Sequence, residues 1–343
     1  MRAMMRQEVA TLAELQAILG RMAGRRVLVL GDMLADEYII GRPSRLSREA
    51  PIPVLEWVDR YIVPGGATNL ARNCRALGAV VAVCGVIGDD EPGRALAARL
   101  AEEGIATDGL MIEVGRPTAT ATRVIGGGTQ IVSQQIARID RVVRAPIAPA
   151  TQERLGAYLA GVMAGFDALV VSDYEHGVIA PAIIAVALPL ARRHGLTITV
   201  DAHGDLDRFV GITVATPNQD EAAASLGRAL DGDALVCAAG QELARRMDAR
   251  GVLITRGSEG LTLAVRDGGC HHLPAVARAE VRDATGAGDT VSATVTLALA
   301  AGGDLLAAAR LGNLAAGVVV RYLGAATITP DALSAAIAAA VAG

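Results

Sequence analysis

Short apolar runs alternate along the chain with longer segments rich in alanine and leucine. The short runs end in glycine or in polar residues, which is typical of buried parallel strands. The predicted strands are 26–31, 80–87, 168–172, 196–201, 213–216, 252–255 and 261–265. The predicted helices are 68–77, 91–103, 178–191, 290–301 and the alanine-rich tail after Pro330. This alternation predicts an α/β fold with a doubly wound, mainly parallel sheet flanked by helices.

The pattern changes between residues 37 and 63, where prolines and polar residues separate two apolar stretches, 38–40 and 51–58. Such a segment predicts a few exposed strands, forming a small sheet inserted between the first strand and the first helix of the main domain. We call this predicted sheet the lid. We therefore expect a main domain of residues 1–36 and 64–343 and a principal lid insertion of 37–63, with further lid strands around 110–140.

Composition narrows the chemistry. Hydrophobic residues make up 52% of the chain and aromatic residues only 2%, so we expect a core of Ala, Val, Leu and Ile. The chain contains no lysine, and all 32 Lys+Arg residues are arginine. A P-loop lysine, a protein-kinase strand lysine and Schiff-base chemistry are therefore excluded. If ATP binds, backbone amides, Mg²⁺ and arginine must carry its phosphate charge.

Charge and hydropathy indicate where the protein acts. The net charge of −4 gives no electrostatic case for nucleic acid. The apolar runs are shorter than a membrane span requires, and residues 1–20 contain no long apolar segment, so we expect a cytoplasmic protein. The four cysteines are scattered without a CxxC pair, which predicts reduced core thiols. They are Cys74, Cys84, Cys237 and Cys270.

The most informative segment is 283–290, Asp-Ala-Thr-Gly-Ala-Gly-Asp-Thr, which precedes an apolar helical run. The backbone N–H groups of Gly286, Ala287 and Gly288 would point at one spot, where the positive end of the helix dipole also lies. Such a spot is a cradle for an anion. Asp289 would stand at its rim as a proton acceptor. A cradle and a base are what phosphoryl transfer to a hydroxyl requires. The alternative is a glycine-rich turn that caps a buried helix.

A second glycine-rich turn, Pro-Gly-Gly-Ala-Thr-Asn at 64–69, precedes the helix 68–77. Asn69 can both donate to and accept from a polyol. Asp32 and Asp36 follow the first strand, in the loop where α/β proteins place ligand groups. Together with Gly65 and Gly66, these side chains form a candidate sugar site, although a capped tight turn also explains the glycines.

Two further segments follow predicted strands. Asn218 and Glu221 share a helix face, which indicates either a capping box or a water-mediated contact to Mg²⁺ or phosphate. The segment 255–260 is either a hairpin turn or a nucleotide loop, in which Arg256 would meet a triphosphate. A dinucleotide-dependent oxidoreductase is not expected, because residues 31–36 lack the G-x-G-x-x-G pattern.

These motifs resemble the two signatures of the ribokinase-like (PfkB) sugar kinases. The first signature matches Gly65 to Asn69 with Gly78 and Gly88 downstream, and the second matches 283–289. The second departs mildly, with Ala284 and Thr294 at positions where other residues are usual. The resemblance covers 26–329 and implies a ribokinase-like fold with a lid.

The resemblance also implies the ligands of such a kinase. They are ATP and Mg²⁺, with a monovalent cation as a further candidate. It implies that Asp289 is the base, that Glu221 reaches Mg²⁺ through water and that Asn313 lies near the purine. The nucleotide-binding residues it implies are Asn218, Glu221, Thr255, Arg256, Gly257, Gly260 and Asn313.

Within that family, the segments 44–54, 134–140, 172–174 and 314–319 are similar to the heptose 7-phosphate kinases of lipopolysaccharide inner-core synthesis. This similarity implies phosphorylation of the anomeric hydroxyl of D-glycero-D-manno-heptose 7-phosphate, with Arg138 among the substrate contacts. His176 and His203 stand where that subfamily usually has lysine. Each histidine either keeps a donor there or marks a site that no longer binds a second phosphate.

Alternatives therefore remain open at this stage. They are a PfkB kinase for another sugar, sugar phosphate or nucleoside, and a non-catalytic sugar-binding regulator. A nucleotidyltransferase module, which often follows such kinases, is not expected because the sequence ends at Gly343. The apolar residues of the lid, among them Ile52 and Trp57, predict a homodimer formed through the lids, as in similar kinases.

Overall fold

The computed structural model describes residues 2–128, 131–276, 281–322 and 324–340. The strands are β1 (Arg26–Leu46), β2 (Pro53–Gly66), β3 (Val80–Ile87), β4 (Ala106–Ile112), β5 (Ala119–Gly128), β6 (Ile131–Arg141), β7 (Ala168–Asp173), β8 (Thr197–Ala202), β9 (Val214–Ala215), β10 (Gly251–Thr255), β11 (Leu261–Val265) and β12 (Cys270–Leu273). The helices are α1 (Arg2–Met22), α2 (Ala67–Ala76), α3 (Glu91–Glu102), α4 (Pro149–Val162), α5 (Pro181–Arg193), α6 (Gln219–Leu226), α7 (Asp233–Arg246), α8 (Ala287–Ala300), α9 (Leu305–Val319) and α10 (Pro330–Ala339).

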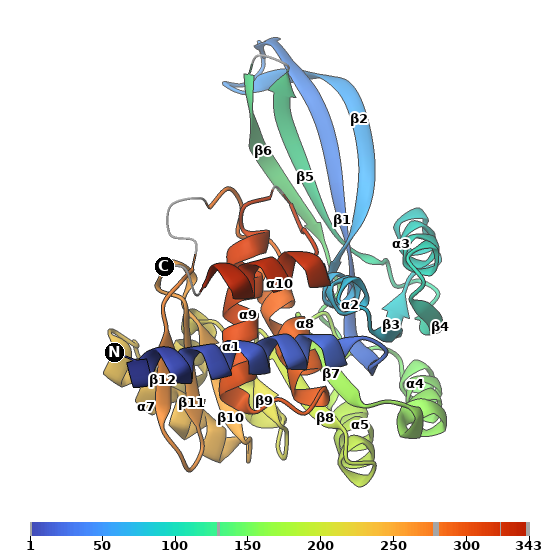
Figure 1. Cartoon of the computed structure of the whole chain (residues 1–343). Coiled ribbons are helices and arrows are strands. Elements are labelled where there is room, and N and C mark those ends of the chain that lie inside the picture. Colours follow the sequence, from blue (N-terminus) through green and yellow to red (C-terminus); the bar gives the residue numbers. More distant parts are fainter. Residues whose placement is uncertain (1, 129–130, 277–280, 323, 341–343) are drawn as a thin grey trace.

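The main sheet has the order β12-β11-β10-β9-β8-β7-β1-β3-β4 (Figure 1). Neighbouring strands from β10 to β4 pair in parallel, whereas β11 and β12 pair antiparallel at one edge. The order reverses beside β1, which is the switch point where α/β sheets bind ligands. The predicted doubly wound, mainly parallel sheet is therefore confirmed.

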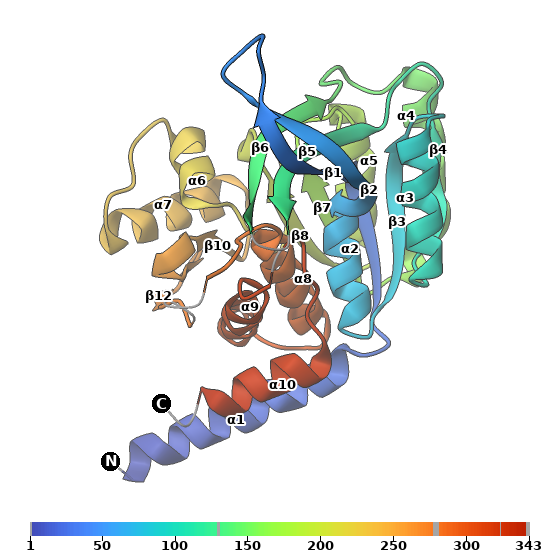
Figure 2. The same ribbon diagram turned by 90° about the horizontal axis from the view of Figure 1, so that it is seen from above.

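Helices cover both faces of this sheet. Helices α1, α2, α3, α8, α9 and α10 pack on one face, around side chains such as Leu70, Leu96 and Leu311. Helices α4 to α7 pack on the other face, around Leu155 and Leu243. Figures 1 and 2 show α1 and α10 side by side, and a hydrogen bond from the Gln16 amide to the Ser334 carbonyl joins them. Among the described residues, no helix is long and apolar enough to cross a membrane.

The lid grows out of the main sheet without a break. In β1, residues up to Asp32 pair with β3, and residues from Met33 pair with β2. Strand β5 then joins β1 in parallel and β6 joins β5 antiparallel, so the lid sheet is β2-β1-β5-β6. Figure 1 shows these strands standing above the main domain. Arg60 of β2 pairs with Glu91 of α3 (2.7 Å) and ties the lid to that domain.

Two sequence predictions need correction. Cys237 of α7 and Cys270 of β12 are joined in a disulfide, so only Cys74 and Cys84 are buried free thiols. The partner of Cys237 lies 33 positions away, and only the folding of α7 against the antiparallel edge brings the two cysteines together. Asp32 and Asp36, expected in a loop after the first strand, both lie within β1, which continues past them to Leu46.

Candidate active site

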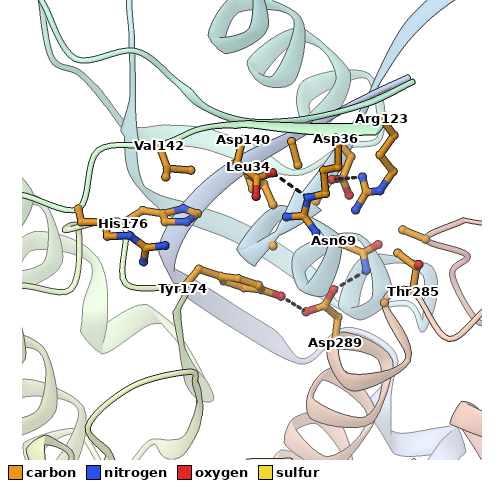
Figure 3. Close-up of a pocket in the computed structure, with 17 residues that line it drawn as sticks. Leu34, Asp36, Asn69, Arg123, Asp140, Val142, Tyr174, His176, Thr285 and Asp289 are labelled. Carbon is orange, nitrogen blue, oxygen red and sulfur yellow. Dashed lines mark hydrogen bonds and ion pairs between the residues drawn. The ribbon is translucent and has the colours of Figure 1, made fainter. Parts of the chain in front are cut away.

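A cavity of about 290 Å³ lies between the main domain and the lid, beside the switch point of the sheet (Figure 3). Strand β1, the end of β2, the first turn of α2, strands β5 and β6, the loop after β7 and the start of α8 all contribute to its wall. The polar and charged residues that line it include Asp36, Asn69, Arg138, Arg144, Tyr174 and Asp289. The volume is close to the lower end of the range for small-molecule sites, about 300 Å³.

Asp289 lies in the first turn of α8 and is 6% exposed. Its Oδ2 accepts a hydrogen bond from the Asn69 amide (2.6 Å) and its Oδ1 accepts one from the Tyr174 hydroxyl (3.1 Å). Figure 3 shows both donors reaching the carboxylate at the cavity wall. Residues 69 and 289, 220 positions apart in sequence, are thus brought into direct contact.

The carboxylate of Asp289 is tuned to titrate below neutral pH. Burial raises its pKa to about 6, against the opposing effect of the hydrogen bonds from Asn69 and Tyr174. A base with this pKa is ionised at pH 7 and still able to take a proton. Beside it, burial and the negative charge of Asp289 raise the pKa of Asp201 to about 7.

The glycines before Asp289 have different surroundings. Gly286 has φ 75° and caps α8, and an added Cβ there would lie 2.6 Å from the Asn69 amide nitrogen. An added Cβ on Gly288 would meet nothing within 4 Å. The Ala287 N–H donates to the Ala284 carbonyl (3.2 Å), whereas the Gly288 N–H makes no hydrogen bond to a described residue. Gly288 therefore offers the open side of the helix N-terminus to an anion.

The two acidic residues of β1, Asp32 and Asp36, have different surroundings. Asp36 lines the cavity and pairs with Arg123 of β5 (2.5 Å), and Gly65 packs so closely that an added Cβ would lie 2.5 Å from Oδ2 of Asp36. Asp32 does not line this cavity. It is 1% exposed, and its carboxylate accepts hydrogen bonds from the backbone N–H groups of Tyr174 (2.8 Å), His176 (3.1 Å) and Val178 (3.3 Å). Asp32 thus fixes the loop after β7.

Three arginines, Arg123, Arg138 and Arg144, also line the cavity. Arg138 pairs with Asp140 (2.7 Å) on the same strand. Arg144 has no hydrogen-bond or ion-pair partner among the described residues, although it is exposed and lines the cavity. Burial, followed by the charge of Arg144, lowers the pKa of His176, and its Nδ1 has no partner in the described part of the chain. Arg144 is therefore the guanidinium available to an anionic ligand here.

The expected nucleotide segments lie together, but several of their side chains are already engaged. Asn218 and Glu221 form a capping box at α6, and Glu221 also pairs with His203 (2.8 Å). The hydrogen bond that the His203 ring donates to the Glu221 carboxylate raises the pKa of His203. Thr255 bridges to Asn218 across the strand ends.

Arg256 departs from its expected role. Its side chain is 2% exposed and pairs with Asp233 (2.6 Å) and Glu259, so it is not free to meet a triphosphate. Gly257 and Gly260 both have positive φ and flank the turn between β10 and β11, which is the hairpin that the sequence left open. Asn313 of α9 donates to the Pro274 carbonyl (2.8 Å).

Sequence reasoning missed several cavity residues. Arg123 and Asp140 lie on lid strands that were located only as a region, and Arg144 lies in the segment that leads from β6 to α4. Tyr174 was noted only as part of the segment 172–174, which is similar to the heptose 7-phosphate kinases. A Tyr two residues after a buried strand end, in a Ser-Asp-Tyr turn, was the available signal.

The buried carboxylate of Asp289 lines this cavity, and it lies in the first turn of α8. A carboxylate and a helix N-terminus are groups that phosphoryl transfer to a hydroxyl can use. The class that the fold and the site define is a small-molecule kinase. Comparison with known proteins agrees, because the model of the pfkB family carbohydrate kinases matches residues 26–332. The chain belongs to this family, and it is an ATP-dependent carbohydrate kinase.

Curated relatives are similar over nearly all of the chain. The bifunctional protein HldE of Pelobacter propionicus is 40% identical over 326 residues, covering 94% of this chain and 65% of that protein. The HldE of Citrifermentans bemidjiense is 41% identical over 320 residues, covering 93% of this chain and 64% of that protein. The chain thus spans slightly less than two thirds of the length of these relatives.

Solved structures share the fold. Ribokinase of Arabidopsis thaliana, complexed with ribose and ATP, superposes with a TM-score of 0.71 at 18% identity, covering 92% of this chain and 99% of that one. Phosphofructokinase-2 of Escherichia coli, in complex with potassium, gives 0.73 at 20% identity, covering 94% and 100%. At these identities the likeness concerns the fold alone, and it confirms the predicted ribokinase-like architecture.

Proposed function

We propose that this protein transfers the γ-phosphoryl group of ATP to the C1 hydroxyl of D-glycero-D-manno-heptose 7-phosphate. The observation that carries the proposal is a cavity lined both by a held carboxylate, Asp289, and by the guanidinium of Arg144, which has no partner among the described residues. A sugar with a hydroxyl to be phosphorylated and a phosphate elsewhere matches both groups. Similarity to the HldE proteins supports the same substrate.

In this mechanism Asp289 takes the proton of the acceptor hydroxyl while that oxygen bonds to the γ-phosphorus and the bond to the β–γ bridging oxygen breaks. Asn69 and Tyr174 hold the carboxylate in place for this step. Asp36, held by Arg123, would bind sugar hydroxyls together with the backbone of Gly65 and Gly66. Closure of the lid over the cavity would exclude water, which otherwise competes as acceptor.

The phosphates of ATP would lie along the N-terminus of α8. The free N–H of Gly288 and the open space above it fit an anion there, whereas the N–H of Ala287 would have to leave the Ala284 carbonyl. Mg²⁺ would neutralise phosphate charge when bound. Both oxygens of Glu221 already have partners, His203 and the Asn218 N–H, so a water-mediated contact to the metal fits better than direct ligation. A monovalent-cation requirement stays a prediction.

Arg144→Met tests the phosphate end of the cavity. With heptose 7-phosphate as acceptor, KM should rise about 10- to 100-fold, because a hydrogen bond to a charged group contributes about 1.5–3 kcal/mol. With the unphosphorylated heptose, KM should not change. The measurement is the initial rate of ADP release at varied acceptor concentration.

The matched control for this test is Arg193→Met, which removes an exposed arginine of α5 that does not line the cavity. It should leave both KM values unchanged. Equal KM values for the two acceptors in the native protein would contradict a phosphate-binding role for Arg144. They would favour a kinase for an unphosphorylated sugar, the alternative that the histidines at 176 and 203 raise.

We also infer a cytoplasmic homodimer joined through the lids. Leu46, Ile52 and Trp57 are 73%, 56% and 71% exposed on the lid, and an apolar sheet surface of this kind is typically covered by a partner. Light scattering at micromolar concentration should give twice the chain mass, and Trp57→Glu should shift it toward the monomer. A monomeric native protein would contradict this inference.

A further inference from the structure

Tyr174 contacts both the carboxylate of Asp289 and His203, which forms an ion pair with Glu221. Its hydroxyl donates to Oδ1 of Asp289, and its ring lies 4.4 Å from the His203 ring, centroid to centroid. In the part of the chain that the structure describes, Asn69 and Tyr174 are the donors to the Asp289 side chain. Asn69 holds Oδ2, so the direction of Oδ1 depends on Tyr174.

The loop that carries Tyr174 is fixed by strong local constraints. Asp32 accepts the backbone N–H of Tyr174, and the Glu175 N–H donates to Asp173 (2.9 Å). Glu175 has φ 59°, which is uncommon for a residue with a side chain. Gly177 has φ 85°, and an added Cβ there would lie 2.1 Å from the Ala145 carbonyl oxygen. Strained backbone of this kind persists where surrounding contacts demand it and is concentrated at functional sites.

We propose that Tyr174 is a positioning residue for the base: its hydroxyl aims Oδ1 of Asp289 at the acceptor and keeps that carboxylate ionised, while Asp32 holds the tyrosine in place. This inference rests on the proposed role of Asp289. It gives buried Asp32 a purpose other than the sugar contact expected from the sequence.

The electrostatics agree with this role. A donor to a carboxylate favours the charged form, so the Tyr174 hydroxyl lowers the pKa of Asp289 while burial raises it. Asp36 in β1 raises that pKa further, and His203 lowers it. Asp201, at the end of β8, also interacts with Asp289. Burial and the charge of Asp289 raise the pKa of Tyr174 well above its usual value, so the phenol keeps its proton throughout the range of assay.

Tyr174→Phe is the test, because it keeps the ring beside His203 and removes only the hydroxyl. Without this donor the pKa of Asp289 rises, so the acid limb of kcat/KM should move up by about one pH unit. At pH 6 the activity should fall about 5-fold more than at pH 8.5, where the carboxylate is ionised in both proteins. Tyr322→Phe, at a tyrosine that is 58% exposed, is the matched control and should leave the limb unmoved.

A second measurement leaves the native contacts in place. Replacing the five tyrosines by 3-fluorotyrosine makes the phenol a more acidic and stronger donor, which should move the acid limb to lower pH. The same labelling of the Tyr174→Phe protein should have no such effect. These opposite shifts do not arise from a general loss of packing.

The outcomes distinguish failure of the positioning role of Tyr174 from failure of the proposed role of Asp289 as the base. Turnover that survives Asp289→Asn overturns the proposed base, and the role of Tyr174 with it. If Asp289→Asn is inactive but the acid limb stays in place in Tyr174→Phe, or only the plateau falls, the positioning role alone is overturned. Shifts in both directions, with the control unmoved, support it.

Discussion

Asp289→Asn should lower kcat about 10²- to 10⁴-fold, the usual cost of losing a positioned base. Asparagine has nearly the same shape: its oxygen can accept from the Asn69 amide and its NH2 can donate to the Tyr174 hydroxyl oxygen, but it cannot take the proton of the acceptor hydroxyl. Binding of the sugar phosphate, measured by calorimetry without nucleotide, should therefore change little. Asp304→Asn is the matched control: it replaces the N-cap of α9 by an equally good cap residue, outside the cavity.

Two results would contradict this account of Asp289. An unchanged kcat would show that no base is needed at this position. A normal kcat at saturating sugar with a greatly raised KM would make the residue a binding group instead. In the native protein, activity should fall as pH drops through about 6, because the raised pKa of Asp289 leaves the carboxylate protonated below that value.

Gly288→Val should lower kcat/KM for ATP at least about 100-fold, as expected when a main stabilising donor of the transition state is blocked. The side chain would enter the open space above the N-terminus of α8, where the new Cβ would meet no atom within 4 Å beyond its chain neighbours and the backbone of its own helix. The phosphates would be displaced while the fold is kept. Gly288→Ala should give a smaller loss, and the melting temperature of both variants should stay close to that of the native protein.

If Gly288→Val instead keeps the native kcat/KM for ATP, the loop only caps the helix. Gly286 offers a contrast, because its positive φ and the nearby Asn69 amide leave no room for a side chain. Loss of activity in Gly286→Ala would therefore report displacement of Asn69 from Asp289, and not a blocked phosphate.

Most of the main sheet was predictable because its central parallel strands contain short, continuous apolar runs. Strand β4 interrupts its apolar residues with Thr107, Asp108 and Gly109, and the pattern did not predict it as a strand of the main sheet. The predicted strand 80–87 coincides with β3, and the predicted helix 91–103 with α3 to within one residue. The lid was harder to predict. Strand β1 continues from the buried sheet into the lid, and it already pairs with β2 from Met33, before the pattern changes at residue 37. Strands β5 and β6 lie far along the chain from β1 and β2.

The positions of site residues were predictable where a sequence motif fixes the backbone. They were less predictable where a charged side chain can pair either with a ligand or with another residue of the protein. The turns at 64–69 and 283–289 place Asn69 and Asp289 at two helix starts, and the fold brings them together. Asp32 and Arg256 carry charges that the sequence offered to ligands, but both are buried and paired within the protein. The Cys237–Cys270 pair likewise depends on which helix packs against which strand, a choice that local sequence does not encode.

The central claim is tested most directly by the consumption of Mg·ATP with a panel of acceptors, followed by ³¹P NMR of the product. The panel is heptose 7-phosphate, fructose 6-phosphate, fructose, ribose and adenosine. The account predicts turnover with heptose 7-phosphate and a second phosphate on C1 of the product. Turnover only with an unphosphorylated acceptor, or with none of them, would contradict it.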